Sequence, residues 1–580
     1  MIVSVQALRD AGEIDALDEH FAHAMCRLVA CEDELVGLAA ALASRAPGAG
    51  HVCADLRRLV ATPVADESGA PVEGLEWPEP EMWLDRIRAS GLVDEGAPLH
   101  LDEGGNLYLR RYWTYQGDLI DALKRRAAEV LEPEDGAALQ RRLDQLFEAG
   151  LQRDAAELAV RRRLAVISGG PGTGKTHTVA RIVALLQDQA PEHIRVVLVA
   201  PTGKAAARLQ ESLREATAGL PDDLGADLQL RAQTIHRCLG WRPDAPTRFR
   251  HDRDRPLPAD VVLCDEASMV DLPLMAKLVD AVPDHARLIL LGDRDQLASV
   301  EAGAVLGDIC RRDATETLPD VPIAGCLVHL EKSWRFAEAP GIGQLAAAIN
   351  AGDSEEAMAI LDGEDFEDVS LIEASDEDHP EELIGSALVD GYRPLCSART
   401  PREALAALGR FRVLCAHRRG RFGVDAINQS VRAQLSREGL VRPQGEWFPG
   451  RPVMVTRNDY PLDLFNGDVG VTLEDEPGRL RVYFEGVDGQ LRSFHPARLP
   501  PCDTVYAMTV HKSQGSEFDD ILVLLPSRGS RILTRELVYT GITRARSRVR
   551  IIADRSVLDE AIGARVQRAS GLRAALWGAT

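Results

Sequence analysis

The pattern of apolar and polar residues changes character along the chain. Before about residue 110, apolar residues recur at helical spacing, as over 17–29 and 83–92, between polar loops. That alternation gives way after about residue 152 to short apolar runs at 164–167, 196–200, 261–264 and 288–291, each followed by a polar loop and a helical pattern. This second pattern predicts parallel strands with helices on both faces of the sheet. Such sheets bind ligands at the carboxyl ends of their strands.

Another α/β pattern begins after residue 335 and is interrupted before it is complete. Runs with a two-residue period at 452–455, 469–473, 480–484 and 491–494 predict strands with one buried face. A chain of 580 residues is too long for one hydrophobic core. We therefore predict an α/β fold with a small helical N-terminal domain at 1–112, a first parallel-sheet core at 113–335, a second core at 336–444 and 501–580, and an inserted β-barrel at 445–500.

Two segments carry no recognisable chemistry of their own. Residues 240–258 are polar, rich in Pro and Arg, and lie between two predicted core strands, so they predict a protruding hairpin. The N-terminal 1–112 ends in the string LYLRRYWTYQ, which predicts a short strand and then a helix over 117–130. This N-terminal part is either a docking domain for a partner or a purely structural cap.

The net charge of −23 is unusual for a protein that binds nucleic acid, because phosphates attract basic surfaces. Much of the excess is local: residues 353–382 contain fourteen Asp and Glu and no Lys or Arg, and without them the net charge is about −9. A mildly acidic protein can still hold a basic groove. The acidic segment is either a solvated loop or helix face, or a contact to a basic partner.

Compartment and redox state follow from what the sequence lacks. No run approaches the roughly 18 uninterrupted apolar residues that a membrane span requires, and the N-terminus lacks a basic start followed by an apolar run. Ten cysteines are scattered without a CxxC pair, which indicates reduced and mostly buried thiols. We expect a cytoplasmic protein.

The string GGPGTGKT follows the first predicted core strand and opens a helical pattern. This is the strand, loop and helix context in which a glycine-rich loop cradles phosphates with backbone N–H groups. Its lysine is expected to contact the β- and γ-phosphates of ATP, and its last hydroxyl to complete a Mg²⁺ site. The loop residues are Gly169, Gly170, Pro171, Gly172, Thr173, Gly174, Lys175 and Thr176.

Further polar residues end the other predicted strands of the two cores. Asp265 and Glu266 follow 261–264, where Asp265 is expected to hold Mg²⁺ through water and Glu266 to act as general base. Gln296 follows 288–291, and its amide is expected to sense the γ-phosphate. Downstream, Arg335 and Arg544 are candidates to neutralise the transition state of phosphoryl transfer, and Arg544 is favoured over its neighbour Arg546.

Together these strings resemble those of superfamily 1 helicases. APTGKAAARL, TIHRCLG and MTVHKSQGSEF are similar to the segments with which such motors grip single-stranded DNA and link it to the nucleotide. The resemblance implies two RecA-like P-loop motor domains and an inserted SH3-like β-barrel. It also implies that Gln152 reads adenine and that Glu517 approaches the ribose. The implied DNA contacts are Thr202, Lys204, Thr234, His236, Thr509 and His511, of which the two histidines, taken singly, are also compatible with satisfied loop residues.

Within that superfamily, residues 105–555 resemble the RecD family through ISGGPGTGKT, DEASMVD, SWRF and FNGDVG. This resemblance implies 5′-to-3′ translocation on single-stranded DNA, and assembly with RecB-like and RecC-like subunits into a heterotrimer that processes DNA ends in recombinational repair. No nuclease-like cluster of acidic residues with a lysine stands out, so DNA degradation is expected to belong to a partner.

Three rival interpretations are open on sequence alone. A free-standing helicase of the same branch would need no partners, although its relatives tend to carry a longer N-terminal extension. A nucleotide-dependent scaffold would clamp DNA without moving, but its hydrolytic site should be defective, whereas Lys175, Glu266, Gln296 and Arg544 are all present. A P-loop kinase has no use for Gln296 or for a second core.

Overall fold

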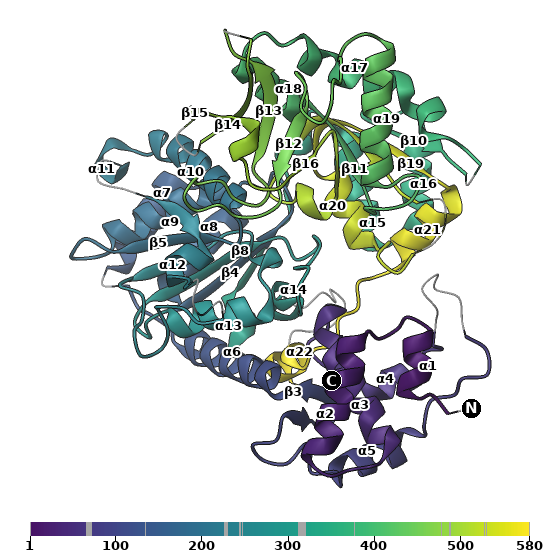
Figure 1. Ribbon diagram of the computed structural model, residues 1–580. Helices are drawn as coiled ribbons and strands as arrows, with labels where there is room; N and C mark the ends of the chain where they lie inside the picture. The colour runs from purple at the N-terminus through teal and green to yellow at the C-terminus, as the bar shows by residue number, and fades with distance from the viewer. Residues whose placement is uncertain are drawn as a thin grey trace.

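The described residues of the computed structural model form four β-sheets (Figure 1). The structure describes residues 2–64, 72–133, 135–225, 230–242, 245, 247–310, 321–375, 377–476, 478–486, 489–526, 528 and 530–578.

The N-terminal part has a hydrophobic core of its own. Helix α3 (Glu34–Gly48) is buried along most of its length, and the buried Trp83 donates a hydrogen bond of 2.8 Å from its indole to the Leu35 carbonyl. Helix α6 (Arg110–Ala128) starts earlier than predicted, because it follows strand β3 (Asn106–Leu109) directly. The neighbouring elements are α1 (Val5–Asp10), α2 (Ala16–Leu28), β1 (Ala54–Asp55), α4 (Leu56–Val60), α5 (Pro80–Arg88) and β2 (Leu99–Leu101).

The first core is a parallel sheet of six strands in the order β6-β5-β7-β8-β4-β9. One apolar core lies under α7 to α10, and another lies under α6 and α13 on the opposite face. The predicted strands are confirmed at their predicted places. The elements are α7 (Gly136–Leu146), α8 (Leu151–Arg161), β4 (Leu164–Gly169), α9 (Lys175–Asp188), β5 (Val196–Ala200), α10 (Gly203–Ala218), β6 (Ala232–Thr234), α12 (Ile235–Leu239), β7 (Val261–Cys264), α13 (Leu272–Ala281), β8 (Arg287–Gly292), α14 (Val305–Ile309) and β9 (Leu327–Leu330).

The second core is a parallel sheet of five strands in the order β10-β19-β18-β11-β17. Helices cover both of its faces, as the sequence pattern predicts, so the α/β fold class with two parallel sheets is confirmed. The elements are α15 (Pro340–Ala351), α16 (Ser354–Asp362), β10 (Val369–Glu373), α17 (Pro380–Ser397), α18 (Pro401–Arg410), β11 (Phe411–Cys415), α19 (Val424–Arg437), β17 (Ala507–Thr509), β18 (Phe518–Leu524), α20 (Arg535–Ile542), β19 (Ala545–Ala553) and α21 (Arg555–Gly563).

The insertion in the second core is an antiparallel sheet in the order β15-β14-β13-β12-β16. Its last strand, β16 (Cys502–Thr504), pairs with β12 (Pro452–Val455), so the sheet extends beyond the predicted end at residue 500. A pairing of β15 with β16, which would close a barrel, is not among the strand pairs of the described residues, and the SH3-like barrel stays a prediction. The other strands are β13 (Val469–Glu474), β14 (Leu480–Glu485) and β15 (Leu491–Phe494).

The segment predicted as a hairpin, 240–258, doubles back on itself. Trp241 pairs with Phe249, and Asp252 pairs with Arg255, each through an isolated antiparallel bridge. Residues 243, 244 and 246 lie outside the described part of the chain. The segment lies between α12 and β7 in the chain order of the first core.

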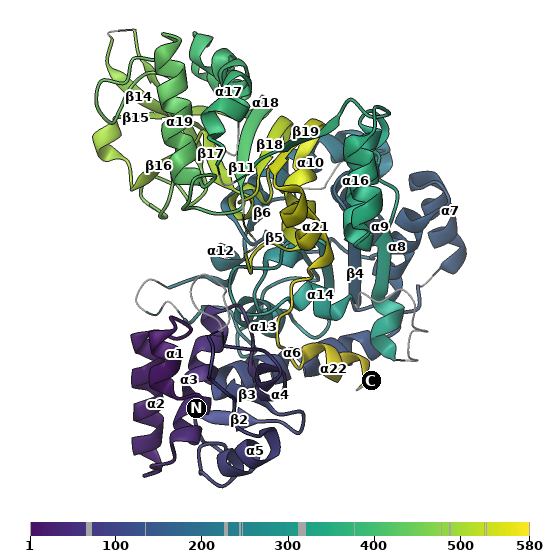
Figure 2. The ribbon, with the colours of Figure 1, turned by 90° about the vertical axis from the view of Figure 1, so that its right-hand side faces the viewer.

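The end of the chain leaves the second core, which differs from the prediction that 501–580 belongs there as a whole (Figure 2). After α21 the chain crosses to the N-terminal domain, where the Val52 amide donates 2.8 Å to the Ala569 carbonyl. Helix α22 (Leu572–Trp577) then packs against α6 and α14, and the Trp577 indole donates 3.2 Å to the Asp308 carbonyl. This placement buries the apolar side chains of Leu572, Leu576 and Trp577 in the same core as residues of α6 and α14. Within the described residues, no helix combines the length and the apolarity needed to cross a membrane.

Candidate nucleotide-binding site between the two cores

The glycine-rich loop connects the carboxyl end of β4 to the start of α9. Gly172 and Gly174 have φ of 75° and 80°, a left-handed conformation that L-residues other than glycine rarely adopt. The amide of Trp334 donates 2.9 Å to the Gly172 carbonyl, and the Ser333 hydroxyl donates 2.8 Å to the Pro171 carbonyl. The segment 333–335 therefore holds the loop from outside.

Replacing Gly172 with alanine is expected to weaken nucleotide binding. A Cβ at this position would lie 2.3 Å from the Arg335 Cβ, and the positive φ adds backbone strain. We expect an affinity loss of about tenfold for a fluorescent ATP analogue, since strain of about 1 to 3 kcal/mol is typical. The matched control is Gly117→Ala, where an added Cβ meets nothing within 4 Å. Equal affinity of both variants and the wild type would show that the loop tolerates the side chain.

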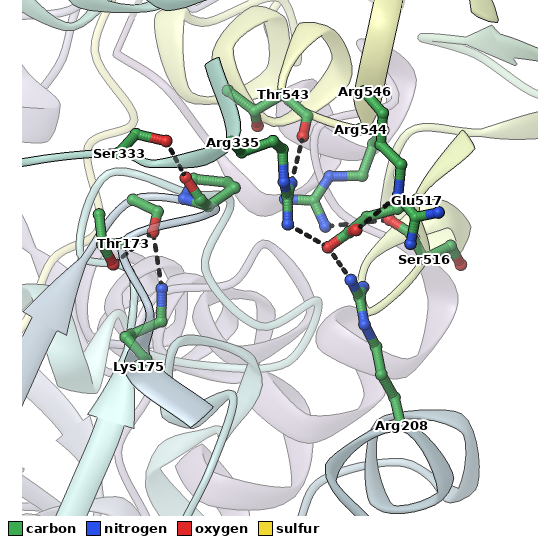
Figure 3. Close-up of polar contacts among 12 residues, drawn as sticks. Thr173, Lys175, Arg208, Ser333, Arg335, Ser516, Glu517, Thr543, Arg544 and Arg546 are labelled. Atoms are coloured by element: carbon green, nitrogen blue, oxygen red, sulfur yellow. Dashed lines mark hydrogen bonds and ion pairs between the residues drawn. The ribbon is translucent and has the colours of Figure 1, made fainter. Parts of the chain in front are cut away.

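Lys175 is the first residue of α9, and its side chain turns back to the loop (Figure 3). Its ammonium donates to the carbonyls of Gly169 and Gly170 at 2.5 and 2.9 Å. Burial lowers the pKa of Lys175, and the carboxylates of Asp293 and Glu266 act in the opposite direction. The ammonium is therefore held at the loop by two backbone carbonyls, and contact with a phosphate stays a prediction.

The two adjacent carboxylates follow β7 at the sheet edge. Asp265 is buried, and burial together with the charge of Glu266 raises its pKa. Glu266 has a φ of 51°, so its backbone is in the left-handed region although it is not glycine. Asp265 and Thr176 line the same cavity. Their oxygens suit Mg²⁺, which proteins usually bind through one or two carboxylates, waters and substrate phosphates.

Gln296 is buried beside Asp293, and its amide donates 2.9 Å to the Asp293 carboxylate. The Tyr539 phenol of the second core donates 3.0 Å to the same carboxylate. Next to Gln296, the Leu297 amide donates 2.9 Å to the Thr540 hydroxyl, and Gln514 donates 2.9 Å to the Leu297 carbonyl. Hydrogen bonds thus connect the segment after β8 directly to the second core.

Glu517 is the centre of a group of arginines at the interface of the cores (Figure 3). Its carboxylate forms ion pairs with Arg208 of the first core and with Arg335, and a third at 3.1 Å with Arg546. Burial and the neighbouring guanidinium groups lower the pKa of Arg335. One carboxylate therefore offsets the repulsion between cations that arrive from both cores.

Arg544 is buried and points into the same interface. Its Nε donates 3.0 Å to the Thr540 carbonyl, while its Nη2 is buried with no hydrogen-bond partner among the described residues. Burial lowers the pKa of Arg544, whereas the carboxylates of Glu266 and Asp293 favour its charged form. A buried donor without a partner is costly, and a phosphate oxygen would satisfy it.

A cavity of about 400 Å³ collects most of the predicted nucleotide residues. Lys175 and Arg544 both line it, so the loop of the first core and the arginine of the second face one space. Gln152, Gly169 and Gly170 do not line it, and the Gln152 amide instead donates 2.9 Å to the Thr173 carbonyl behind the loop. The lining residues from our prediction are Pro171, Gly172, Thr173, Gly174, Lys175, Thr176, Asp265, Glu266, Gln296, Arg335, Glu517 and Arg544.

Sequence reasoning missed Arg208 and Tyr539 at this site. Arg208 lines the cavity four residues after Lys204 on α10, and that spacing places both side chains on one face of the helix. This spacing was a usable signal. Tyr539 stands in the string that contains Arg544, but its partner Asp293 is 246 residues away, so no local pattern indicates the contact.

The residues predicted to contact DNA lie at or just after the carboxyl ends of β5, β6 and β17. Thr202 comes two residues after β5, Thr234 ends the neighbouring strand β6, and their hydroxyls accept backbone N–H bonds at the starts of α10 and α12. Thr509 ends the edge strand β17 of the second core, and His511 follows it. Lys204 is half-buried, and burial with nearby Arg412 and Arg208 lowers its pKa to about 8. His236 is exposed, its ring 5.7 Å from that of Phe249. Contact with DNA stays a prediction for all six.

Comparisons with known proteins agree along the whole chain. Residues 10–108 match the family described as RecBCD enzyme subunit RecD, N-terminal domain; 152–302 match an AAA domain; and 504–552 match the UvrD-like helicase C-terminal domain. The RecBCD enzyme subunit RecD of Mycobacterium tuberculosis is 43% identical over 98% of this chain and 96% of its own length. The chain belongs to the RecD family. The likeness extends through the N-terminal domain, where the sequence motifs alone gave little sign of it.

The matched AAA domain and UvrD-like helicase C-terminal domain, together with a helicase among the relatives, show that this chain is an ATP-dependent DNA helicase. A second relative, the ATP-dependent RecD2 DNA helicase of Deinococcus radiodurans, is 36% identical over 67% of this chain but 46% of its own length. Among solved structures, Bacteroides Pif1 bound to single-stranded DNA covers 73% of this chain and 95% of that chain, at 16% identity and a TM-score of 0.41.

Proposed function

We propose that this RecD-family chain moves 5′ to 3′ along single-stranded DNA, as the motor subunit of a helicase–nuclease that processes double-strand ends. The observation that carries the proposal is the shared cavity: Lys175 of the first core and Arg544 of the second line one space of nucleotide size. A nucleotide held there touches both cores, so its hydrolysis changes the contact between them.

ATP is held by the loop backbone and Lys175, with Gln152 and Glu517 at the base and sugar end in this proposal. Thr176 and Asp265 would hold Mg²⁺, which when bound would supply positive charge beside the phosphates. Glu266 accepts a proton from the attacking water, and Arg335 and Arg544 neutralise the charge that builds on the γ-phosphate oxygens.

Coupling to movement runs through the hydrogen bonds beside Gln296. The Gln296 amide lines the cavity, and the next residue, Leu297, exchanges hydrogen bonds with Thr540 and Gln514 of the second core. A shift of Gln296 on loss of the γ-phosphate therefore changes the fit of the two cores. Thr202, Thr234 and Thr509, which are predicted to contact DNA, lie at the carboxyl ends of strands of the two sheets and move with those sheets.

The subunit form is favoured over a free-standing helicase by the matched N-terminal domain. Residues 10–108 match the N-terminal domain of RecBCD enzyme subunit RecD, and the RecD of M. tuberculosis is 43% identical over 98% of this chain. We therefore propose RecB-like and RecC-like partners in a heterotrimer, with the N-terminal domain as the docking part and DNA degradation assigned to a partner.

The proposal predicts strong stimulation of ATP hydrolysis by single-stranded DNA. The measurement is the ATPase rate with and without oligonucleotide, followed by unwinding of duplexes with a 5′ or a 3′ single-stranded tail. We expect stimulation by at least about tenfold, and unwinding from the 5′ tail only. A chain whose ATPase ignores DNA is a nucleotide-dependent scaffold rather than a motor. Co-purification with two larger subunits tests the proposed heterotrimer. A monomer that unwinds DNA without partners would contradict the heterotrimer.

A further inference from the structure

The two insertions touch each other through aromatic side chains. Trp241, at the start of the segment 240–258 in the first core, stacks on Tyr460 of the insertion in the second core, with ring centroids 5.6 Å apart and planes inclined by 21°. Tyr460 in turn meets Phe465 edge-on at 6.0 Å. A row of three rings thus bridges the cores, and none of the three is among the residues that line the nucleotide cavity.

The row ends on the predicted DNA grip. A Cβ placed on Gly203 would lie 3.5 Å from the Phe465 Cβ, so Phe465 rests on the chain between Thr202 and Lys204. On the other side, Trp241 follows helix α12, which begins after Thr234. The rings therefore lie between the first core, near Thr202 and Thr234, and the insertion of the second core.

A cavity of about 510 Å³ beside Trp241 combines aromatic and basic side chains. The ammonium of Lys277 lies 5.5 Å from the centre of the Phe249 ring at its wall. Ring faces together with guanidinium groups are the chemistry with which proteins bind unpaired nucleobases and their phosphates. The lining side chains are Trp241, Phe249, Arg242, Arg250, Arg255 and Asp252.

The stack itself is open to solvent, since Tyr460 keeps 53% of its surface exposed. Replacing the contact between two exposed rings by a contact of each ring with a base costs little stacking free energy, because each π-face stacks equally well on a base. One ring comes from each core, so the contact opens when the cores move apart. Separation of Trp241 from Tyr460 would expose one face of each ring to a strand bound between the cores.

We propose that Trp241 and Tyr460 form a base-stacking gate, in which a nucleobase of single-stranded DNA replaces the contact between the two rings. The inference rests on the proposed function, because it requires single-stranded DNA in the groove between the cores. The gate adds stacking contacts with the bases to the predicted contacts with the DNA backbone. Each base that passes forms and then breaks one stacking contact.

The test compares Trp241→Ala and Tyr460→Ala with the conservative Trp241→Phe and Tyr460→Phe, in the full chain and with any partners that co-purify. Binding is measured to an oligothymidylate and to the same oligonucleotide with abasic sites. We expect each alanine variant to bind the oligothymidylate about tenfold more weakly, and to bind the abasic strand as the wild type does. The phenylalanine variants should stay within about twofold. Leu491→Ala, an exposed apolar residue of the same insertion, is the matched control.

Each result decides the question. Equal weakening on both strands assigns the rings a structural role and overturns the gate, as does unchanged binding of the oligothymidylate. DNA-independent ATPase activity at the wild-type level shows that the alanine variants are folded. If wild-type ATPase activity is not stimulated by DNA at all, the proposed function fails and not the gate alone. If DNA stimulates the wild-type ATPase but the alanine variants bind the oligothymidylate as the wild type does, the proposed motor function stands and the gate is excluded.

Discussion

Replacing Arg544 with alanine is expected to lower ATP turnover about a thousandfold while leaving nucleotide affinity within about threefold. Arginines that reach a transferred phosphoryl group in this way contribute about 10³ to 10⁵ in rate, because the charge they neutralise develops only in the transition state. Arg544 is suited to this role: it is buried, its Nη2 has no partner among the described residues, and it lines the cavity with Lys175. The measurement is kcat with saturating single-stranded DNA, alongside binding of a fluorescent nucleotide.

Arg546→Ala is the matched control for this prediction. Arg546 is two residues away and also reaches Glu517, but its side chain is 55% exposed. An exposed ion pair contributes little, so we expect turnover within a few-fold of the wild type. If instead Arg546→Ala abolishes turnover and Arg544→Ala spares it, the two arginines exchange roles.

Replacing Lys175 with alanine is expected to abolish measurable ATP hydrolysis, a loss of about a thousandfold or more. The ammonium is the one lysine cation among the residues that line the described cavity, and its loss removes charge from both the bound phosphates and the transition state. Unlike Arg544→Ala, this change should also weaken nucleotide binding by about 10- to 100-fold, since hydrogen bonds to charged groups contribute about 1.5 to 3 kcal/mol.

The control for Lys175→Ala is Lys124→Ala, on the exposed face of α6. Its ATPase rate and thermal midpoint should equal those of the wild type. Hydrolysis by Lys175→Ala at more than about a tenth of the wild-type rate would place the catalytic phosphate contact elsewhere. Lys175→Ala and Arg544→Ala also separate the roles of the two cations. The first should lower both nucleotide affinity and turnover, whereas the second should lower turnover alone.

The strands and the residues at their ends were predictable because both signals are local. A strand such as 261–264 needs only a short buried run, and Asp265 and Glu266 follow it at once. The phosphate loop is likewise one contiguous string. Local order therefore identified the phosphate loop and the strand-end residues of the cavity lining on the first core, but not the lining residues of α10 such as Arg208.

The contacts that join distant parts were not predictable in this way. Arg208 meets Glu517, and Tyr539 meets Asp293, across hundreds of residues, and only the packing of the two cores brings them together. The last helix was assigned to the wrong core for a related reason. Its apolar face of Leu572, Leu576 and Trp577 indicates burial, but the sequence does not say against which surface.

The crossing of the C-terminal segment gives the second core two attachments to the rest of the chain. One is the peptide between Arg335 and α15, and the other is the stretch from α21 to Ala569, whose carbonyl is bound by the Val52 amide. Two connections restrict how the second core can move relative to the rest of the chain more than one connection would. Removing residues 565–578 should relax that restriction without removing any of the predicted catalytic side chains.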